Sequence, residues 1–211
     1  MNNLPIEQDI DSFAVWTKKM WFGDDDARDV LSDKDYNVMS LGLGGETGEV
    51  MEVIHSISSN YPIDKDWAKK ELGDVLYYWA RLGNAFNISL SNIIKEERGR
   101  LGFKNPLLKF DDVALGFYKT YDYTKDENGI LKRTLFLGVS VGMVQEILKK
   151  RVRDGVFFID KFEIAMVETI KAWCSLCIAL DILPSQVISS NISKIEDRKR
   201  RGTMRGSGNN R

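Results

Sequence analysis

Two pairs of acidic residues on neighbouring predicted helices constrain the fold of this chain more than any other feature. Glu46 and Glu49 lie three residues apart in LGLGGETGEVMEVIH, and Glu71 and Asp74 repeat that spacing in KKELGDVLYYWA. Residues three or four apart share one face of an α-helix, so each pair predicts a helix with an acidic face. The 21 residues between the pairs are enough to end one helix, turn and begin an antiparallel one. The sequence therefore predicts a helical hairpin on which the acids face one another.

Carboxylates this close destabilise a fold unless a cation lies between them. Two unit charges about 5–6 Å apart repel by about 3 kcal/mol at an effective dielectric constant near 20, whereas a domain is stable by only about 5–15 kcal/mol. An all-oxygen carboxylate set suits Mg²⁺ or Mn²⁺. One such acidic pair alone is usually a solvated helix face. Two pairs on consecutive apolar helices instead favour a metal site, with the ligands Glu46, Glu49, Glu71 and Asp74.

Composition and charge narrow the class of protein. The chain has 211 residues, is 43% hydrophobic and carries a formal net charge of −1, which predicts one large domain or two small ones. The balanced charge argues against nucleic acid as a partner. We find no basic-then-apolar leader and no apolar run of about 18 residues, so the sequence predicts a cytoplasmic protein without a membrane span. Cys174 and Cys177, within an apolar helical pattern, predict two reduced thiols in the core.

Helical periodicity recurs along the chain, and no segment shows convincing strand alternation. Apolar residues predict a first helix over residues 6–22. Further helices are predicted over about 35–59 and 66–86, and from Ser89, as a cap, to about Leu101. The predicted fold class is therefore all-α.

The second half of the chain repeats the pattern of the first. The segment LGVSVGMVQEILKK resembles LGLGGETGEVMEVI at a shift of 96 residues. The segment AWCSLCIALDILPSQVI resembles YWARLGNAFNISLSNII at a shift of 94, which places Trp173 on Trp79. These matches predict a tandem duplication, with one repeat over residues 1–104 and a second over residues 105–211.

The second repeat lacks most of the acids of the first. At these shifts, the positions of the four acids are taken by Gly142, Gln145, Ala165 and Glu168. A single metal site is therefore predicted, in the first repeat. The second repeat contributes instead a polar and basic stripe at helical positions i, i+3 and i+7, on a helix that begins near Pro184. The stripe consists of Asn191, Lys194 and Arg198. Each half thus carries part of one predicted site.

The acid pairs and their surroundings resemble the all-α nucleoside triphosphate pyrophosphohydrolases, a family that includes the MazG-like proteins and the dimeric dUTPases. The family signature is ExxE, a spacer and ExxD, which here corresponds to Glu46 to Glu49 and Glu71 to Asp74. The closing sequence NISKIEDRKRRGTMRGSGN is similar to the end of many MazG-like chains. The resemblance covers about residues 8–102 and, in a degenerate second copy, residues 110–211.

The resemblance implies a helical bundle of two MazG-like repeats packed as an intrachain pseudo-dimer, either monomeric or paired as a homodimer. It implies hydrolysis between the α and β phosphates of a nucleoside triphosphate, with Mg²⁺ on the four acids, to give a (d)NMP and pyrophosphate. The residues expected to contact the phosphates are Tyr78, Asn191, Lys194 and Arg198. Trp16 or Trp21, on the first predicted helix, could stack on the base, although core packing is the favoured interpretation for either residue.

Two other functions remain open on the sequence. A relative that acts on phosphoribosyl-ATP or on an alarmone would use the same acids. Alternatively, the basic end from Lys194 to Arg211, with seven Lys and Arg residues, would let a non-catalytic helical protein bind nucleic acid. The affinity of such a protein would fall steeply with salt.

Overall fold

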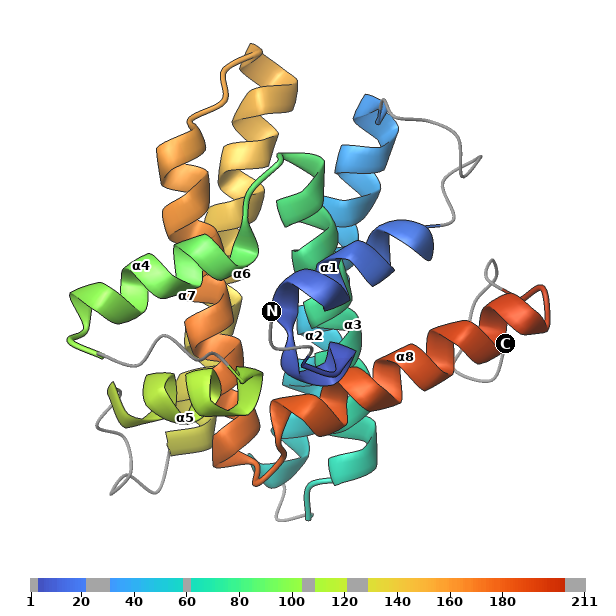
Figure 1. The fold of residues 1–211 in the computed structure, drawn as a ribbon, viewed down its shortest axis with the longest axis vertical. Coiled ribbons are helices and arrows are strands. Elements are labelled where there is room, and N and C mark those ends of the chain that lie inside the picture. Colours follow the sequence, from blue (N-terminus) through green and yellow to red (C-terminus); the bar gives the residue numbers. More distant parts are fainter. Residues whose placement is uncertain (1–3, 22–30, 59–61, 104–108, 121–128, 204–211) are drawn as a thin grey trace.

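The computed structural model describes residues 4–21, 31–58, 62–103, 109–120 and 129–203, and all secondary structure in these residues is helical (Figure 1). The all-α fold class is confirmed. No helix in the described residues is long and apolar enough to cross a membrane. A 3-10 helix, η1, spans Ile6–Gln8, and the α-helices that follow are α1 (Ile10–Lys19), α2 (Asp33–Ser58), α3 (Lys65–Ala85), α4 (Leu90–Arg100), α5 (Phe110–Thr120), α6 (Gly129–Asp154), α7 (Ile159–Ala179) and α8 (Pro184–Arg200).

Capping residues account for where several helices begin. The helix predicted over residues 6–22 is divided, because Asp9 is the N-cap of α1 and its carboxylate accepts a hydrogen bond from the backbone N–H of Asp11 at 3.1 Å. Asp64 caps α3 in the same way. Pro184 opens α8, where its missing N–H costs no helical hydrogen bond. Ser89 precedes α4 as predicted, but its side chain makes no capping hydrogen bond.

Four long helices form the centre of the molecule. Helix α2 packs on both α3 and α6, and α6 packs on α7. The shorter helices α1, α4, α5 and α8 cross in front of this group in Figure 1. One buried apolar cluster includes side chains from both halves of the chain, among them Phe13, Trp79, Phe162 and Trp173. The two predicted repeats therefore share a core. Their predicted boundary at residues 104 and 105 lies outside the described residues.

Small residues where α2 meets α6 reveal the register between the two halves. A Cβ atom at Gly44 would overlap the side chain of Gln145, and a Cβ atom at Gly138 would overlap that of Met51. Gly138 follows Gly44 by 94 residues, and Gln145 follows Met51 by the same number, so the two contacts are reciprocal. Burial agrees with this shift: residues 39, 43, 50 and 54 are buried, and so are residues 133, 137, 144 and 148.

This register corrects the equivalence predicted for the first acid pair. The shift of 96 residues, which placed Gly142 and Gln145 on that pair, is wrong by two. At the shift of 94, the equivalents of Glu46 and Glu49 are Ser140 and Met143. The mismatch arises because LG occurs twice in the first repeat, at residues 41–42 and 43–44, and the sequence match used the first copy. The second half still lacks three of the four acids.

Candidate metal and phosphate site

Helices α2 and α3 bring three of the predicted acids together. Carboxylate oxygens of Glu46, Glu49 and Glu71 lie within 4.8 Å of one another. Glu71 is 2% exposed, Glu46 is half-buried and Glu49 is exposed, so the cluster extends from the helix interface to the surface. An all-oxygen set of this size fits a hard divalent cation such as Mg²⁺ or Mn²⁺.

Glycines on α2 position the cluster and leave space beside it. The ring of Tyr78 lies against Gly42, where a Cβ atom would overlap it. This contact lets α3 approach the backbone of α2 closely. A Cβ atom at Gly45 or Gly48 would meet no atom within 4 Å, so the surface next to Glu46 and Glu49 is open. Gly42 therefore allows α3 to pack closely on α2, whereas Gly45 and Gly48 leave the surface beside the acids accessible.

The electrostatics of the cluster favour a cation. Burial, together with repulsion from Asp74 and Glu49, raises the pKa of Glu71 to about 7. Burial and repulsion from the other three acids raise the pKa of Glu46 to about 8, although the nearby Lys194 ammonium opposes the shift. Without a metal ion, the cluster therefore retains protons near neutral pH, and a bound cation would displace them.

The fourth acid, Asp74, is held by α8. Asn191 donates a hydrogen bond from its Nδ2 atom to Asp74 Oδ1 at 2.8 Å, and Lys194 forms an ion pair with Asp74 Oδ2. Gly73 permits this approach, because a Cβ atom there would lie 2.9 Å from Asn191 Cβ. Arg198 lies half-buried one turn further along α8. The structure thus brings the polar stripe of the second half to the acids of the first.

Buried polar atoms without a partner gather in this region. Such atoms are rare in folded proteins, and each costs about 1–3 kcal/mol. In the described residues there are five: Glu71 Oε1, Tyr77 OH, Arg81 Nε and Asn191 Oδ1 on α3 and α8, and Arg98 Nη1 on α4. The open lone pairs of Glu71 Oε1 fit a metal ligand. The other atoms on α3 and α8 have unused hydrogen-bonding capacity.

The aromatic residues predicted to contact substrate lie on the α1 side of α3. Tyr78 is half-buried, and its ring meets that of Trp21 edge to face at 6.5 Å between centroids. Trp16 is buried, stacks on Phe13 at 5.5 Å, and donates from Nε1 to Glu196 Oε1 at 3.1 Å. Trp16 is therefore placed as a core residue that anchors α8 to α1, and Trp21 is the more accessible of the two indoles.

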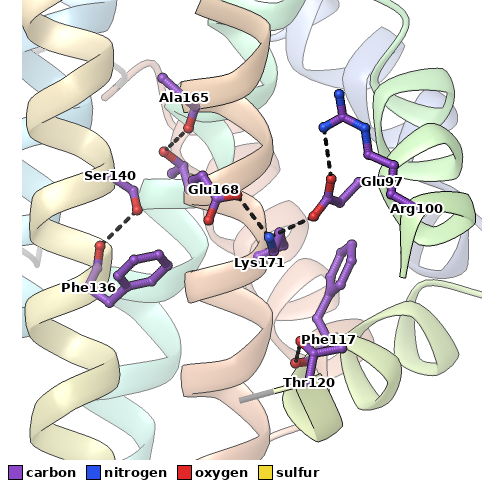
Figure 2. A network of polar contacts seen from close by, with 10 residues as sticks. Glu97, Arg100, Phe117, Thr120, Phe136, Ser140, Ala165, Glu168 and Lys171 are labelled. Atoms are coloured by element: carbon purple, nitrogen blue, oxygen red, sulfur yellow. Dashed lines mark hydrogen bonds and ion pairs between the residues drawn. The ribbon is translucent and has the colours of Figure 1, made fainter. Parts of the chain in front are cut away.

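Lys171 on α7 pairs with one carboxylate of its own helix, Glu168, and with Glu97 of α4 in the first half, as Figure 2 shows. Lys171 Nζ lies 2.7 Å from Glu97 Oε1 and 2.8 Å from Glu168 Oε1. Arg100 adds a weaker contact to Glu97 at 3.5 Å. At the shift of 94 residues, Glu168 corresponds to Asp74, and Glu97 corresponds to Asn191. The equivalent of the acid site is thus closed by a lysine, and its carboxylates are neutralised without a metal ion.

Three of these polar residues were not predicted from the sequence: Tyr77, Arg81 and Lys171. Each lies within an apolar helical pattern and is buried or nearly so. A signal was present for Arg81, which follows Asp74 by seven residues and therefore continues the face on which the acids lie. For Lys171, the signal was a charged residue in the otherwise apolar run of α7. The two cysteines are free and buried, as predicted.

No protein-family model, curated protein or solved structure matches this chain. The assignment of a function therefore depends on the residues and on their arrangement.

Proposed function

We propose that this chain is a Mg²⁺-dependent nucleoside triphosphate pyrophosphohydrolase related to the MazG-like proteins, which cleaves between the α and β phosphates. The proposal is carried by one observation: an acidic cluster lies next to Asp74, and Asp74 is contacted by side chains that can donate to phosphate. Three carboxylates lie within 4.8 Å of one another on the α2–α3 side. Asn191 and Lys194 reach Asp74 from α8. An acidic cluster alone would have no preference for phosphate, whereas a cluster beside an ammonium group and an amide has one.

The acids of α2 and α3 fit the metal ion. Glu46 and Glu49 supply oxygens from α2 and Glu71 from α3, and Glu71 Oε1 has no hydrogen-bond partner in the described residues. When bound, Mg²⁺ neutralises phosphate charge and lowers the pKa of a coordinated water. A carboxylate of this set that does not ligate the ion can accept the proton of the attacking water. Open surface beside Gly45 and Gly48 admits the phosphates.

The residues of α8 would change partner when substrate binds. In the ligand-free chain, Lys194 and Asn191 are held by Asp74. A triphosphate supplies oxygens that compete for the Lys194 ammonium and the Asn191 amide, which frees Asp74 to join the other three acids. Lys194 then lies where negative charge develops on the departing pyrophosphate, and Arg198 extends the donors by one turn.

The geometry of α8 favours this function over nucleic-acid binding. Lys194 is directed at Asp74 rather than at open solvent. Asp197 pairs with Arg200 and Arg201, at 2.5 Å and 2.7 Å, and so offsets part of the positive charge at the end of α8. The rest of the predicted basic end, residues 204–211, lies outside the described residues.

A product analysis tests the proposal. The purified chain is incubated with Mg²⁺ and a panel of dNTPs, NTPs, phosphoribosyl-ATP and an alarmone, and the products are separated by chromatography. We expect a nucleoside monophosphate and pyrophosphate, dependent on Mg²⁺ or Mn²⁺ and lost with a chelator. A diphosphate with phosphate, or no turnover of any compound, would overturn the proposal. Salt-sensitive nucleic-acid binding without turnover would favour the non-catalytic alternative.

A further inference from the structure

We propose that Tyr77 and Arg81 form the nucleoside subsite, and that Arg81 selects bases with a carbonyl group on the pairing edge over bases with an amino group there. The favoured bases are guanine, uracil and thymine, and the disfavoured ones are adenine and cytosine. This inference rests on the proposed function, because it takes the phosphates to bind at the acid cluster.

The position of Arg81 follows from the face of α3. Glu71, Asp74, Tyr78 and Arg81 stand at helical positions i, i+3, i+7 and i+10, so they share one face. At 1.5 Å per residue, Arg81 lies about 10 Å beyond Asp74 along the helix axis. A nucleotide held by its phosphates at the acids and extended along this face would place its sugar near Tyr78. Its base would then lie near Arg81.

Two buried polar groups in this part of α3 lack a partner in the described residues. Tyr77 and Arg81 are 4% and 3% exposed, yet the Tyr77 hydroxyl and Arg81 Nε make no hydrogen bond. Burial raises the pKa of Tyr77, and the charges of Arg81 and Asp74 both act on it. Tyr77 stands between Asp74 and Arg81 along α3. Burial also lowers the pKa of Arg81, although the nearby Tyr77 and Asp35 oppose the shift.

Trp21 connects this pair to the surface. The Arg81 guanidinium lies over the Trp21 ring at 5.0 Å from its centroid, and Trp21 is half-buried. The ring covers one face of the planar guanidinium. The unpartnered Nε–H lies in the plane of the guanidinium, so a base that reaches it meets both the aromatic side chain and the unpaired donor.

The chemistry of arginine sets the selectivity. A guanidinium has N–H donors and no acceptor. The O6 atom of guanine and the O4 atom of uracil or thymine accept a hydrogen bond from it, whereas the amino groups of adenine and cytosine would place a donor against a donor. The Tyr77 hydroxyl can donate or accept, so it accommodates the neighbouring base atom in either case. A site that depends on such a hydrogen bond rejects analogues that lack it.

Burial and a missing partner do not by themselves make a binding residue, and Arg98 shows this. Arg98 is 6% exposed, lies 4.7 Å from the Phe103 ring centroid, and has an unpartnered Nη1 atom. Like Arg81, it is buried over an aromatic ring with an unpartnered N–H group, but it lies on α4 rather than on the acidic face of α3. At the position equivalent to Arg81, Ser175 accepts a hydrogen bond from Arg133 at 2.8 Å and has its partner within the protein.

The experiment compares Arg81→Met with the matched control Arg98→Met. Initial rates with Mg²⁺ give kcat/KM for dGTP, dTTP, dATP and dCTP. We expect the parent to prefer the carbonyl bases by about tenfold or more. Arg81→Met should lose this preference, Arg98→Met should keep it, and Arg81→Gln should gain activity on dATP, because glutamine pairs with adenine through both a donor and an acceptor.

A second readout separates recognition from folding. If Arg81 awaits a ligand, replacing its buried charge with methionine leaves the thermal unfolding midpoint unchanged or raises it. Binding of dGMP and dAMP, measured by calorimetry with the parent and Arg81→Gln, follows the base preference without turnover. An unchanged base ratio in both Arg81 variants, or an equal change in Arg98→Met, would overturn the inference. Failure of the parent to hydrolyse any nucleotide would instead overturn the proposed function.

Discussion

The indole N–H groups of Trp79 and Trp173 form the same hydrogen bond in opposite directions across the core. Trp79 Nε1 donates to the carbonyl of Met166, and Trp173 Nε1 donates to the carbonyl of Leu72, both at 2.9 Å. Trp173 follows Trp79 by 94 residues, and Met166 follows Leu72 by the same number. A two-fold axis produces such an isologous pair of contacts. On this relationship we base the proposal that the two repeats pack as an intrachain pseudo-dimer.

If the halves pack in this way, the two tryptophans should contribute equally to stability. We expect Trp79→Phe and Trp173→Phe each to lower the free energy of unfolding by about 1–3 kcal/mol, because each removes a buried hydrogen bond and part of a buried ring. Urea denaturation of the single and double variants measures the effect. Losses that differ by more than about 2 kcal/mol would mean that the two contacts are not equivalent in energy.

Glu49→Gln tests the acid site with little risk to the fold, because Glu49 is exposed. The substitution keeps the shape and removes a charged ligand, so we expect pyrophosphate release to fall by more than about a hundredfold. The matched control is Met143→Gln, which changes the equivalent exposed position in the second half. Gln145 is unsuitable as that control, because it donates a hydrogen bond to the carbonyl of Ser40 at 2.9 Å. Equal losses in both variants would show that the active half has been misassigned.

The helices and the acids could be predicted because both depend on local spacing. Helical periodicity and chain breakers placed α2 and α3 to within a few residues, and the i, i+3 pairs placed Glu46, Glu49 and Glu71 on facing surfaces. The stripe on α8 was also visible in the sequence. Its contact with Asp74 was not, because that contact joins residues more than 100 positions apart and depends on how α8 packs against α3.

Buried polar residues mark the limit of what spacing can show. Arg81 and Lys171 both interrupt apolar helices, and the sequence treats them alike. The structure separates them, because Lys171 is surrounded by Glu97 and Glu168 whereas Arg81 Nε has no partner in the described residues. Whether a buried charge is satisfied depends on neighbours from other helices, and periodicity carries no information about those neighbours.

The pKa values of Glu46 and Glu71 predict how pH acts on the metal-free protein. Because these pKa values are raised to about 8 and about 7, the folded state binds more protons than the unfolded state between about pH 5 and pH 8. Stability should therefore fall as pH rises through this range. The contribution from Glu71 is at most about 3 kcal/mol. Thermal unfolding with a chelator, at a series of pH values, measures the slope.

Magnesium should reverse this trend, because it binds the deprotonated acids and only in the folded state. We expect the increase in the unfolding midpoint on adding Mg²⁺ to grow from pH 5 to pH 8. Glu71→Gln should flatten the metal-free slope and reduce the response to Mg²⁺. Glu52→Gln, an exposed substitution on the same helix α2, is the control and should do neither. A response to Mg²⁺ that is independent of pH would place the ion elsewhere.

Lys171 should stabilise the carboxylates of Glu97 and Glu168 in the way that a metal ion stabilises the acid cluster on α2 and α3. Its ammonium group lies between Glu97 and Glu168, and Lys171 is 9% exposed. Lys171→Met leaves two carboxylates close together without a cation, so we expect the free energy of unfolding to fall by about 3–5 kcal/mol. Urea denaturation measures the loss.

Adding Glu97→Gln and Glu168→Gln to Lys171→Met should recover most of the lost stability, because the cluster is then neutral. The Mg²⁺-dependent activity per folded molecule should be unchanged throughout, since Glu46, Glu49 and Glu71 take no part in the ion pairs of Lys171. A loss below about 1 kcal/mol would mean that Lys171 does not neutralise this pair.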